Sequence, residues 1–383
     1  MKKMDAHFGL PPRAILISIV VIVLVFSSGC SDILFGSHKV DFESSPVTTT
    51  QTPLRACWTQ PKVIVGSTGA QLPEAKKILH LLYDDETEMS GDVIVWTDTR
   101  NFDDTLEDIY MYNIAMKQET PLIVVKNRQK RPAISGNLIA YSNWTDDKKI
   151  HVYDLNTGKD TAIPTDHRAE TVDIDGKRVV YDDFNKDSTM MYDLSTGVET
   201  FIMVNGEWPR ISGDYVIYRK SVNGRDDIFL YNIPDKKETC ISCGLTEEPT
   251  ADYRIDGNYV VFDMSTAGEP LRLYNIGTTT TSEIVPCPGK CEYQTGGMCG
   301  AWYDISGDKV VYASGVDCTD CDIDEGVFIY DISAGTTKAL HLHSSHDSDV
   351  DGGLDCRNGG YPRISGNNVI FWQGFEDIYL IKL

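Results

Sequence analysis

The chain has few positive charges for its size. Its 383 residues include 35 lysines and arginines against 57 aspartates and glutamates, so the formal net charge at pH 7 is -22. A field of this sign repels phosphate backbones, and we therefore exclude nucleic acids as partners. Apolar residues are not scarce, because they make up 41% of the chain, and this content excludes a mostly disordered protein.

The sequence also lacks the short motifs that mark common catalytic sites. It contains no Gly-x-Ser-x-Gly nucleophile elbow, no His-Glu-x-x-His zinc motif and no phosphate-binding loop. Its eight histidines are scattered, apart from a group at His341, His343 and His346 that offers ligands for a transition metal. We therefore identify no catalytic residue, and the sequence favours a binding protein over an enzyme.

Long apolar runs are scarce, and the one at the N-terminus has the features of an export signal. It extends from Ala14 to Phe26, after a basic segment at 1–13 and before Ser-Ser-Gly-Cys at 27–30. This arrangement predicts a signal peptide over residues 1–30. Small residues directly before Cys30 resemble the lipobox of prokaryotic lipoproteins, which implies lipidation of Cys30. Ser27 departs from that motif, which usually has an aliphatic residue at this position.

An uncleaved anchor and ordinary secretion remain alternatives to lipidation. The apolar run is shorter than the roughly 20 residues that a spanning helix needs, which favours cleavage. All three possibilities place the folded part outside the cytoplasmic membrane, and lipidation or an uncleaved anchor would also hold it at the cell surface. Residues 31–74 are predicted to form a tether, since 44–53 (SSPVTTTQTP) is rich in Ser, Thr and Pro and has no periodic apolar pattern.

A repeat dominates the rest of the chain. Each copy has an aliphatic residue, Ser or Asp, then Gly, an apolar strand such as VVY, a polar loop, a second strand ending in Tyr-Asp or Tyr-Asn, and a turn before a third apolar strand. The clearest copies begin at Pro132 and Val172. Copies are 37 to 59 residues apart, and their glycines are Gly91, Gly136, Gly176, Gly213, Gly257, Gly307 and Gly366.

Seven copies of about 40 to 45 residues, each with four short strands, predict an all-β fold. The spacing is typical of a seven-bladed β-propeller with four-stranded antiparallel blades, over residues 75–383. The last copy ends at Leu383 without its fourth strand. We therefore expect the segment Lys76–Leu81 to supply that strand and close the ring; the alternative is that this segment is a short helix or a loose arm.

The repeat ISG-x-x-VVY…IYxYD…TG-x-x-T resembles that of the TolB-like β-propellers, especially exported archaeal and bacterial ones. With the acidic composition and the lipobox-like start, it resembles a methanogen-type cell-surface protein. The resemblance covers residues 76–383 and implies a fold but no single function, because such repeats occur in interaction scaffolds, sugar lyases and peptidase accessory domains. Lyases on this fold usually bring several histidines to the central channel. The histidines of this sequence are scattered, so we do not expect them to form such a site.

The polar loops between the VVY-like strand and the strand ending in Tyr-Asp or Tyr-Asn are acidic. In a propeller these loops share one face, which we predict to bind a basic partner or a cation, unless the charges are simply solvated. The candidate residues are Asp103, Asp104, Asp146, Asp147, Asp183, Asp226, Asp227, Asp322 and Asp324. Trp96, Trp302 and Trp372 are expected to pack in the core or a groove.

The segment between the last two repeats contains a candidate calcium site. Its alternating carboxylates and Gly352 resemble EF-hand-like calcium loops, in which oxygen ligands converge on a hard cation. The ligand candidates are Asp347, Asp349, Asp351 and Asp355. We expect a structural role, although Asn358 stands where an EF-hand has its bidentate Glu.

The cysteines predict disulfides, since exported chains oxidise them. Two Cys-x-x-Cys pairs could alternatively form a four-thiolate zinc site, and Cys57 in the tether is the candidate for a free thiol. The disulfide candidates are Cys240, Cys243, Cys287, Cys291, Cys299, Cys318, Cys321 and Cys356. Asn143 begins a glycosylation sequon that we place on an exposed loop.

These features together predict a surface-anchored propeller that binds an envelope protein or glycan without catalysis. The alternative is a metal-dependent carbohydrate-active enzyme resembling a polysaccharide lyase.

Overall fold

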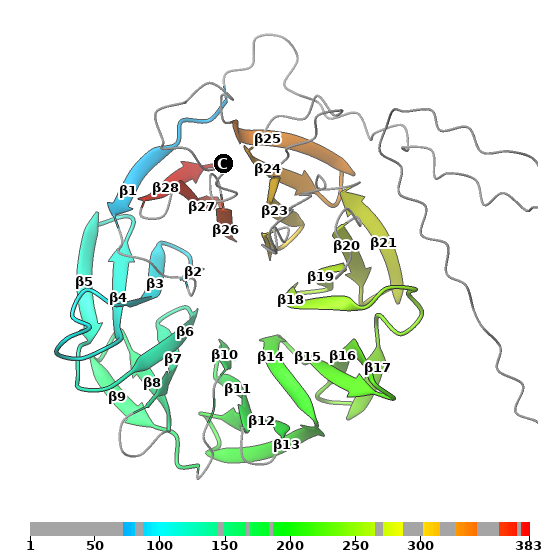
Figure 1. The fold of residues 1–383 in the computed structure, drawn as a ribbon, viewed down its shortest axis with the longest axis horizontal. Helices are drawn as coiled ribbons and strands as arrows, with labels where there is room; N and C mark the ends of the chain where they lie inside the picture. Colours follow the sequence, from blue (N-terminus) through cyan, green and yellow to red (C-terminus); the bar gives the residue numbers. More distant parts are fainter. Residues whose placement is uncertain are drawn as a thin grey trace, which may run out of the picture. The chain divides into compact units, whose positions relative to one another are not determined.

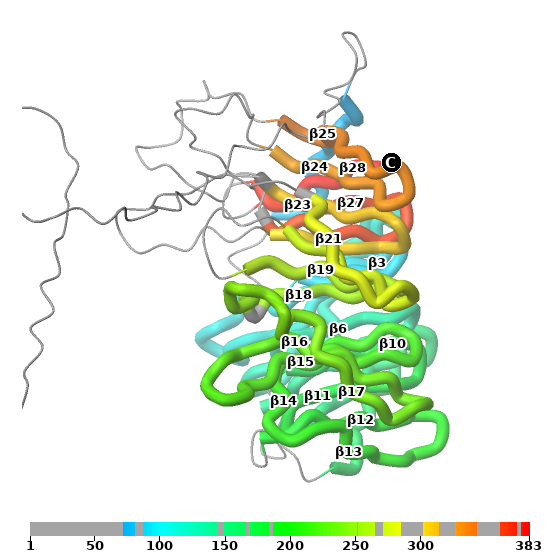
Figure 2. Tube along the Cα trace, turned by 90° about the vertical axis from the view of Figure 1, so that its right-hand side faces the viewer, coloured from blue at the N-terminus to red at the C-terminus, as the bar shows by residue number. Residues whose placement is uncertain are grey.

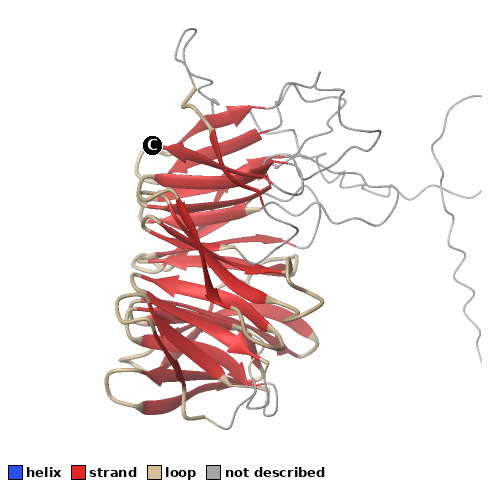
Figure 3. Ribbon diagram, turned by 90° about the vertical axis from the view of Figure 1, so that its left-hand side faces the viewer, coloured by secondary structure: helices blue, strands red, loops and turns tan. Residues whose placement is uncertain are grey.

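The computed structural model describes residues 72–80, 87–144, 149–165, 169, 171–183, 187–264, 271–285, 302–314, 326–342, 360–373 and 377–383. These residues belong to one compact unit, 55–383. Every regular element within the described ranges is a β-strand (Figure 3). Those ranges contain no helix of the length and apolarity needed to cross a membrane.

The strands form seven four-stranded antiparallel sheets, which we number as blades 1 to 7, with strands A to D from the inside outward (Figure 1). Blades 1 to 3 are β2 (Glu88–Ser90), β3 (Val93–Asp98), β4 (Asp108–Asn113), β5 (Gln118–Ile123); β6 (Gln129–Ser135), β7 (Leu138–Asn143), β8 (Ile150–Asp154), β9 (Lys159–Ala162); and β10 (Val172–Asp175), β11 (Arg178–Asp183), β12 (Ser188–Asp193), β13 (Val198–Val204). Blades 4 and 5 are β14 (Gly206–Ser212), β15 (Tyr215–Val222), β16 (Arg225–Asn232), β17 (Lys237–Cys240); and β18 (Pro249–Asp256), β19 (Tyr259–Met264), β20 (Leu271–Asn275), β21 (Thr280–Val285). Blades 6 and 7 are β22 (Tyr303–Ser306), β23 (Lys309–Ser314), β24 (Gly326–Asp331), β25 (Thr336–Leu342); and β26 (Gly360–Ser365), β27 (Asn368–Gln373), β28 (Asp377–Lys382), β1 (Lys76–His80).

The predicted seven-bladed propeller of four-stranded antiparallel blades is therefore confirmed. In the seventh sheet, β1 pairs antiparallel with β28, with Lys76 opposite Leu380 and His80 opposite Asp377. The Nζ atom of Lys77 lies 2.6 Å from a carboxylate oxygen of Asp377 across this pair. The fourth strand of the sheet of the last repeat thus comes from the start of the folded region.

The hydrophobic core is divided among the contacts between neighbouring blades. Each of seven clusters of buried residues joins two successive blades, and one of them joins Leu79 and Leu380 of blade 7 to Trp96 of blade 1. The B strands are buried on both faces because they are covered by a blade on either side. This explains why segments such as Val179-Val180-Tyr181 are continuously apolar instead of alternating.

The turn between strands A and B forms a second contact between blades. All seven repeat glycines have φ between +54° and +60°, a left-handed conformation that favours glycine. The backbone N–H of each glycine donates to the Ser or Asp side chain that precedes the glycine of the previous blade. The pairs are Gly91–Ser365, Gly136–Ser90, Gly176–Ser135, Gly213–Asp175, Gly257–Ser212, Gly307–Asp256 and Gly366–Ser306, at 2.6 to 3.2 Å.

We call this circle of bonds the turn ring. It includes the bond from Gly91 of blade 1 to Ser365 of blade 7, so the circle is complete. The Ser-Gly and Asp-Gly pairs therefore serve two purposes, because the glycine shapes the turn and the preceding side chain binds the next blade. Figure 2 shows the propeller from the side, with the strands running between its two faces.

Candidate functional site

The A strands surround a cavity of about 380 Å³ at their starts, opposite the turn ring. Its walls come from the A strands of six blades and from Trp302, directly before the A strand of blade 6, so no single repeat forms it. The lining residues are Glu88, Arg131, Pro132, Thr171, Val172, Trp208, Pro209, Arg210, Asp252, Tyr253, Arg254, Trp302, Tyr361 and Arg363. Four arginines and two carboxylates among them give a cationic surface inside a protein with a net charge of -22.

Three residues at the mouth of this cavity have an unusual backbone conformation. Arg131, Trp208 and Tyr361 are left-handed, with φ of 52°, 57° and 50°, and each directly precedes a proline. Side chains with a Cβ rarely adopt this conformation, which costs roughly 1 to 2 kcal/mol. The surrounding bulges in β6, β14 and β26 hold these residues there. Strain of this kind tends to occur at functional sites.

Aromatic rings form part of the mouth. Trp208 is 44% exposed, and the guanidinium carbon of Arg219 lies 5.5 Å from the centre of its indole ring. The rings of Trp302 and Tyr361 have centroids 4.5 Å apart and are tilted by 32°. The exposed indole ring of Trp208 beside guanidinium groups can bind an apolar surface and a negative charge together.

The floor of the cavity is an ion-pair network from distant blades. An oxygen of Glu88 lies 3.2 Å from Arg210 of blade 4, and the other lies 3.8 Å from Arg363 of blade 7. Burial alone raises the pKa of the Glu88 carboxyl, but the charges of Arg210, Arg363 and Arg254 outweigh burial and lower that pKa to about 2. Glu88 is therefore an anion that holds several cations in place, and it is unsuited to accept a proton.

On the other side of the floor, Arg254 bridges two carboxylates. Its Nη1 atom lies 2.9 Å from Asp252 and its Nε atom lies 3.8 Å from Asp304. The Nε atom has no hydrogen-bond acceptor among the described residues, although it is buried. Arg254 is thus held between Asp252 at the mouth and Asp304 behind it, and its charge adds to the positive potential of the cavity.

Two further carboxylates behind the lining attach successive blades to each other. Asp173 accepts a hydrogen bond of 2.8 Å from the backbone N–H of Ile211, and Asp304 accepts one of 2.9 Å from that of Ile364. Burial raises the pKa of both carboxyls to about 6, although arginines of the floor oppose the change. These carboxylates hold in place the A strands that line the cavity.

A buried acid lies behind the rim at the end of β19. Asp263 is 8% exposed and accepts hydrogen bonds from the hydroxyls of Thr250 and Tyr303. Tyr303 also donates to the backbone oxygen of Asp252 at the mouth. Burial raises the pKa of Asp263 to about 7, so its charge changes near neutral pH.

The predicted acidic surface is only partly present among the described residues. Asp103 and Asp104 are exposed, but Asp183 is fully buried and Asp227 is 3% exposed, so the prediction of open carboxylates at these two positions is wrong. Both residues lie within strands longer than expected, β11 and β16. Asp226 lies 3.6 Å from Arg219. Asp146, Asp147, Asp322 and Asp324 lie outside the described residues.

The placement of Asn143 on an exposed loop is also wrong. It is the last residue of β7 and is 5% exposed, and its Nδ2 atom lies 3.2 Å from Nε2 of His151. The strand continues two residues beyond the VVY-like core, which buries Asn143.

Two of the cysteines, Cys240 and Cys243, lie within the described residues, and they form a disulfide with each other. The other predicted site residues lie outside the described ranges, as does the assigned signal and tether region up to residue 71. They are Cys30, Cys57, Cys287, Cys291, Cys299, Cys318, Cys321, Cys356, Asp347, Asp349, Asp351 and Asp355. His343 and His346 are outside as well, and His341 lies on β25, where burial lowers its pKa.

The cavity was not predicted from the sequence. Trp96 and Trp372 are buried as expected, whereas Trp302 lines the cavity. A signal was present in the sequence, however. In three of the seven repeats the third residue before the repeat glycine is an arginine, namely Arg210, Arg254 and Arg363. Isoleucine follows each of them and points to the core, so alternation along a strand predicts that the arginines face inward to the channel.

No family model and no curated protein matches the sequence. Among solved structures, an oligogalacturonate lyase from Vibrio parahaemolyticus has a TM-score of 0.56 at 16% identity, covering 82% of this chain and 94% of that one. An oligogalacturonate lyase in complex with manganese has a TM-score of 0.54 at 15% identity, with the same coverage. TolB from Acinetobacter baumannii covers 77% of this chain and 78% of its own at 14% identity, with a TM-score of only 0.38.

Similarity at these identities extends to the fold and no further. The blade topology shows that the folded region is a seven-bladed β-propeller, and its central cavity is lined by arginines and aromatic residues.

Proposed function

We propose that this protein is a surface-anchored, extracytoplasmic β-propeller that binds a carboxylate-bearing envelope protein or glycan without catalysis. The cavity at the centre of the ring is the binding site in this proposal, in place of the acidic loops. One observation carries it: arginines from four blades and strained aromatic residues converge on one cavity in a strongly acidic chain. A ligand carboxylate would gain charge-assisted hydrogen bonds there, and its apolar part would contact Trp208.

The alternative is a metal-dependent carbohydrate-active enzyme, as the manganese-bound lyase of the same fold suggests. An arginine-lined cavity also suits a uronate substrate. The two carboxylates among the lining residues, Glu88 and Asp252, are each paired with an arginine, at 3.2 and 2.9 Å. A metal would compete with these pairs for both ligands, and this competition favours the binding proposal over the enzyme.

Binding of defined probes tests the proposal. We would titrate the protein with an oligogalacturonate, a polyglutamate peptide and a neutral oligosaccharide. We expect binding of a carboxylated probe, weakened about tenfold, or about 1.4 kcal/mol, by Arg131→Gln and by Trp208→Ala. Matched controls are Arg178→Gln at the turn ring and Phe201→Ala on the outer strand β13, both partly exposed and far from the cavity in the fold.

Equal binding by the cavity variants and the controls, or no binding of either carboxylated probe, would contradict the proposal. Formation of an unsaturated uronate product with manganese present would favour the enzyme instead.

We also propose that Cys30 anchors the chain to the membrane through lipid and that calcium binds the Asp347–Asp355 segment. The supporting pattern is the sequence alone. The intact mass of protein purified from its membrane, with and without chelator, tests both. We expect a lipid adduct on Cys30 and loss of one calcium with a lower melting temperature; Asp349→Ala should abolish the effect of chelator on melting.

A further inference from the structure

The disulfide between Cys240 and Cys243 joins residues only three positions apart. It begins at the last residue of β17 and ends in the link to β18, with Cα atoms 5.7 Å apart. The bond lies within one link and connects no two blades. A loop this short also removes less entropy from the unfolded chain than a long loop does. Structural stabilisation is therefore a weak explanation for this cysteine pair.

Other bonds hold the Cys240–Cys243 turn in place. The backbone N–H of Ile241 donates to Ile228, and that of Leu245 donates to Ser242, both at 2.9 Å. The fully buried Ser242 hydroxyl accepts from the N–H of Ile228 at 2.9 Å. Because these bonds do not involve sulfur, reduction of the disulfide would leave both cysteines close to their present positions.

The surroundings of the two sulfur atoms differ in a way that suits exchange with an external thiol. Cys243 is exposed, so its sulfur is open to attack. Cys240 is half-buried, and its Sγ atom accepts a hydrogen bond of 3.0 Å from the backbone N–H of Cys243. A hydrogen bond to sulfur stabilises a thiolate, so Cys240 is the better leaving group.

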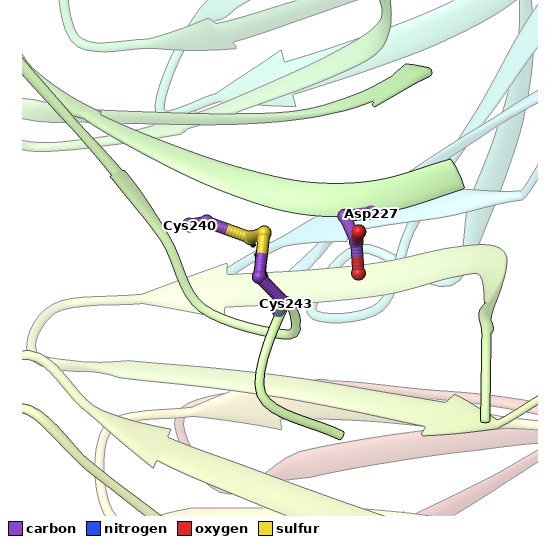
Figure 4. Close-up of side chains that lie close together, drawn as sticks. All are labelled: Asp227, Cys240 and Cys243. Atoms are coloured by element: carbon purple, nitrogen blue, oxygen red, sulfur yellow. Dashed lines mark hydrogen bonds between the residues drawn. A yellow bond between two sulfur atoms is a disulfide. The ribbon is translucent and has the colours of Figure 1, made fainter. Parts of the chain in front are cut away.

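A buried carboxylate lies beside the pair. The ligand atoms of Asp227, Cys240 and Cys243 all lie within 4.8 Å of one another (Figure 4). Ser242 Oγ donates to Asp227 at 2.7 Å, and Arg225 Nε lies 3.2 Å from it, so the carboxylate is held in a fixed place. At this distance from sulfur, a carboxylate can transfer a proton through one water molecule.

We propose that Cys240, Cys243 and Asp227 form a thiol–disulfide exchange site that reacts reversibly with dithiols. A thiolate of the external dithiol attacks Sγ of Cys243, the Cys240–Cys243 bond breaks, and its electron pair leaves on Cys240. The second sulfur of the external dithiol then attacks the mixed disulfide and releases Cys243. The dithiol loses two electrons and two protons and becomes a disulfide, while both cysteines become thiols, and Asp227 relays the proton that Cys240 gains.

The test is the rate and equilibrium of this exchange in the full-length protein, with dithiothreitol as the dithiol. After acid quenching and alkylation, mass spectrometry of the peptide containing Cys240 and Cys243 measures its oxidation state separately from the other cysteines. We expect this pair to be reduced and reoxidised reversibly in the folded protein, with an unchanged far-ultraviolet circular dichroism spectrum. Reduction only under conditions that unfold the protein would overturn the proposal.

The role of Asp227 is tested by Asp227→Asn, with Asp226→Asn as the matched control at the neighbouring, more exposed carboxylate. A proton relay speeds both directions equally. We therefore expect Asp227→Asn to slow reduction and reoxidation about tenfold without shifting the equilibrium ratio of dithiol to disulfide. Equal rates in the two variants, or a shifted equilibrium with an unchanged reoxidation rate, would show that Asp227 relays no proton.

Discussion

The two ends of the inner strands follow different rules. At the turn ring, every blade has the same glycine conformation and the same bond to its neighbour. At the cavity, a few residues earlier in the same strands, the side chains differ from blade to blade and include left-handed Arg131, Trp208 and Tyr361. A contact that all blades need is repeated, whereas a site that binds one ligand needs a different group from each blade. The turn ring therefore serves stability, and the cavity serves recognition.

The largest expected effect comes from the floor of the cavity. Glu88→Ala leaves Arg210 and Arg363 without their shared anion, and we expect a loss of about 3 kcal/mol in the free energy of unfolding at pH 7. The pKa of Glu88 is about 2 when folded, below its ordinary value of 4.5. Its stabilisation is thus present above pH 4.5 and is lost as the pH falls toward 2.

Urea unfolding of both proteins from pH 7 to pH 2.5 measures this effect. The difference between them should shrink at low pH, and Glu119→Ala, at a more exposed pair with Arg100, should cost less than about 1 kcal/mol. If Glu88→Ala lowered the free energy of unfolding no more than this control, the ion pairs of the floor would not stabilise the protein.

The next effect concerns Asp263 behind the rim. Its pKa rises from 3.8 to about 7 on folding, so the protonated form stabilises the protein at low pH and that contribution is lost as the pH rises through 7. Asp263→Asn stays neutral and still accepts from Tyr303, so its stability relative to the wild type should rise by about 2 to 3 kcal/mol between pH 5 and pH 8.5. Melting temperatures from pH 5 to 9 test this, with the exposed Asp235→Asn as control; parallel curves would refute it.

A smaller effect is expected at the turn ring. Ser212→Ala removes the acceptor for the backbone N–H of Gly257, a bond of 3.0 Å at a residue that is 9% exposed. One lost hydrogen bond of this kind costs about 1 kcal/mol. Chemical unfolding compares it with Ser221→Ala, at an exposed serine of β15, which should change stability by less than about 0.5 kcal/mol. Binding of the carboxylated probe should remain unchanged in both variants, which separates the turn ring from the cavity.

The smallest change in stability, with a large change in binding, is expected for Trp208→Gly. Glycine adopts the φ of 57° without strain, so the gain in the folded state offsets the greater flexibility of the unfolded chain, and the net change should be within about 1 kcal/mol. Binding of the carboxylated probe should fall at least as far as in Trp208→Ala. A clear loss of stability in the glycine variant would instead show that Trp208 stabilises the fold, as the turn ring does.

The fold could be predicted from the sequence because local and repeated signals determine it. Continuous apolar B strands, Tyr-Asp strand ends and Ser-Gly or Asp-Gly turns recur seven times, and each copy strengthens the interpretation of the others. The strand ends were less predictable. Asn143, Asp183 and Asp227 were placed in open loops, yet pairing with the neighbouring strand continues far enough to bury them.

The cavity could not be predicted because its residues are scattered from Glu88 to Arg363. Nothing near Glu88 in the sequence indicates that Arg210, which follows it by 122 positions, will lie 3.2 Å away. Likewise, the Cys-x-x-Cys spacing suggested a disulfide or a zinc site, and only the fold brings buried Asp227 beside Cys240 and Cys243.

The sequence by itself determined the all-β class, the seven blades and the glycine turns, since these depend on periodicity and backbone conformation within each repeat. The tertiary structure alone decided that each Ser or Asp before a glycine binds the next blade, that arginines of separate repeats share Glu88, and that one cationic cavity opens in an acidic protein. The physical reason is ring closure, which brings corresponding positions of different repeats close together at the centre, where charges and hydrogen bonds act over a few ångströms whatever their separation in the chain.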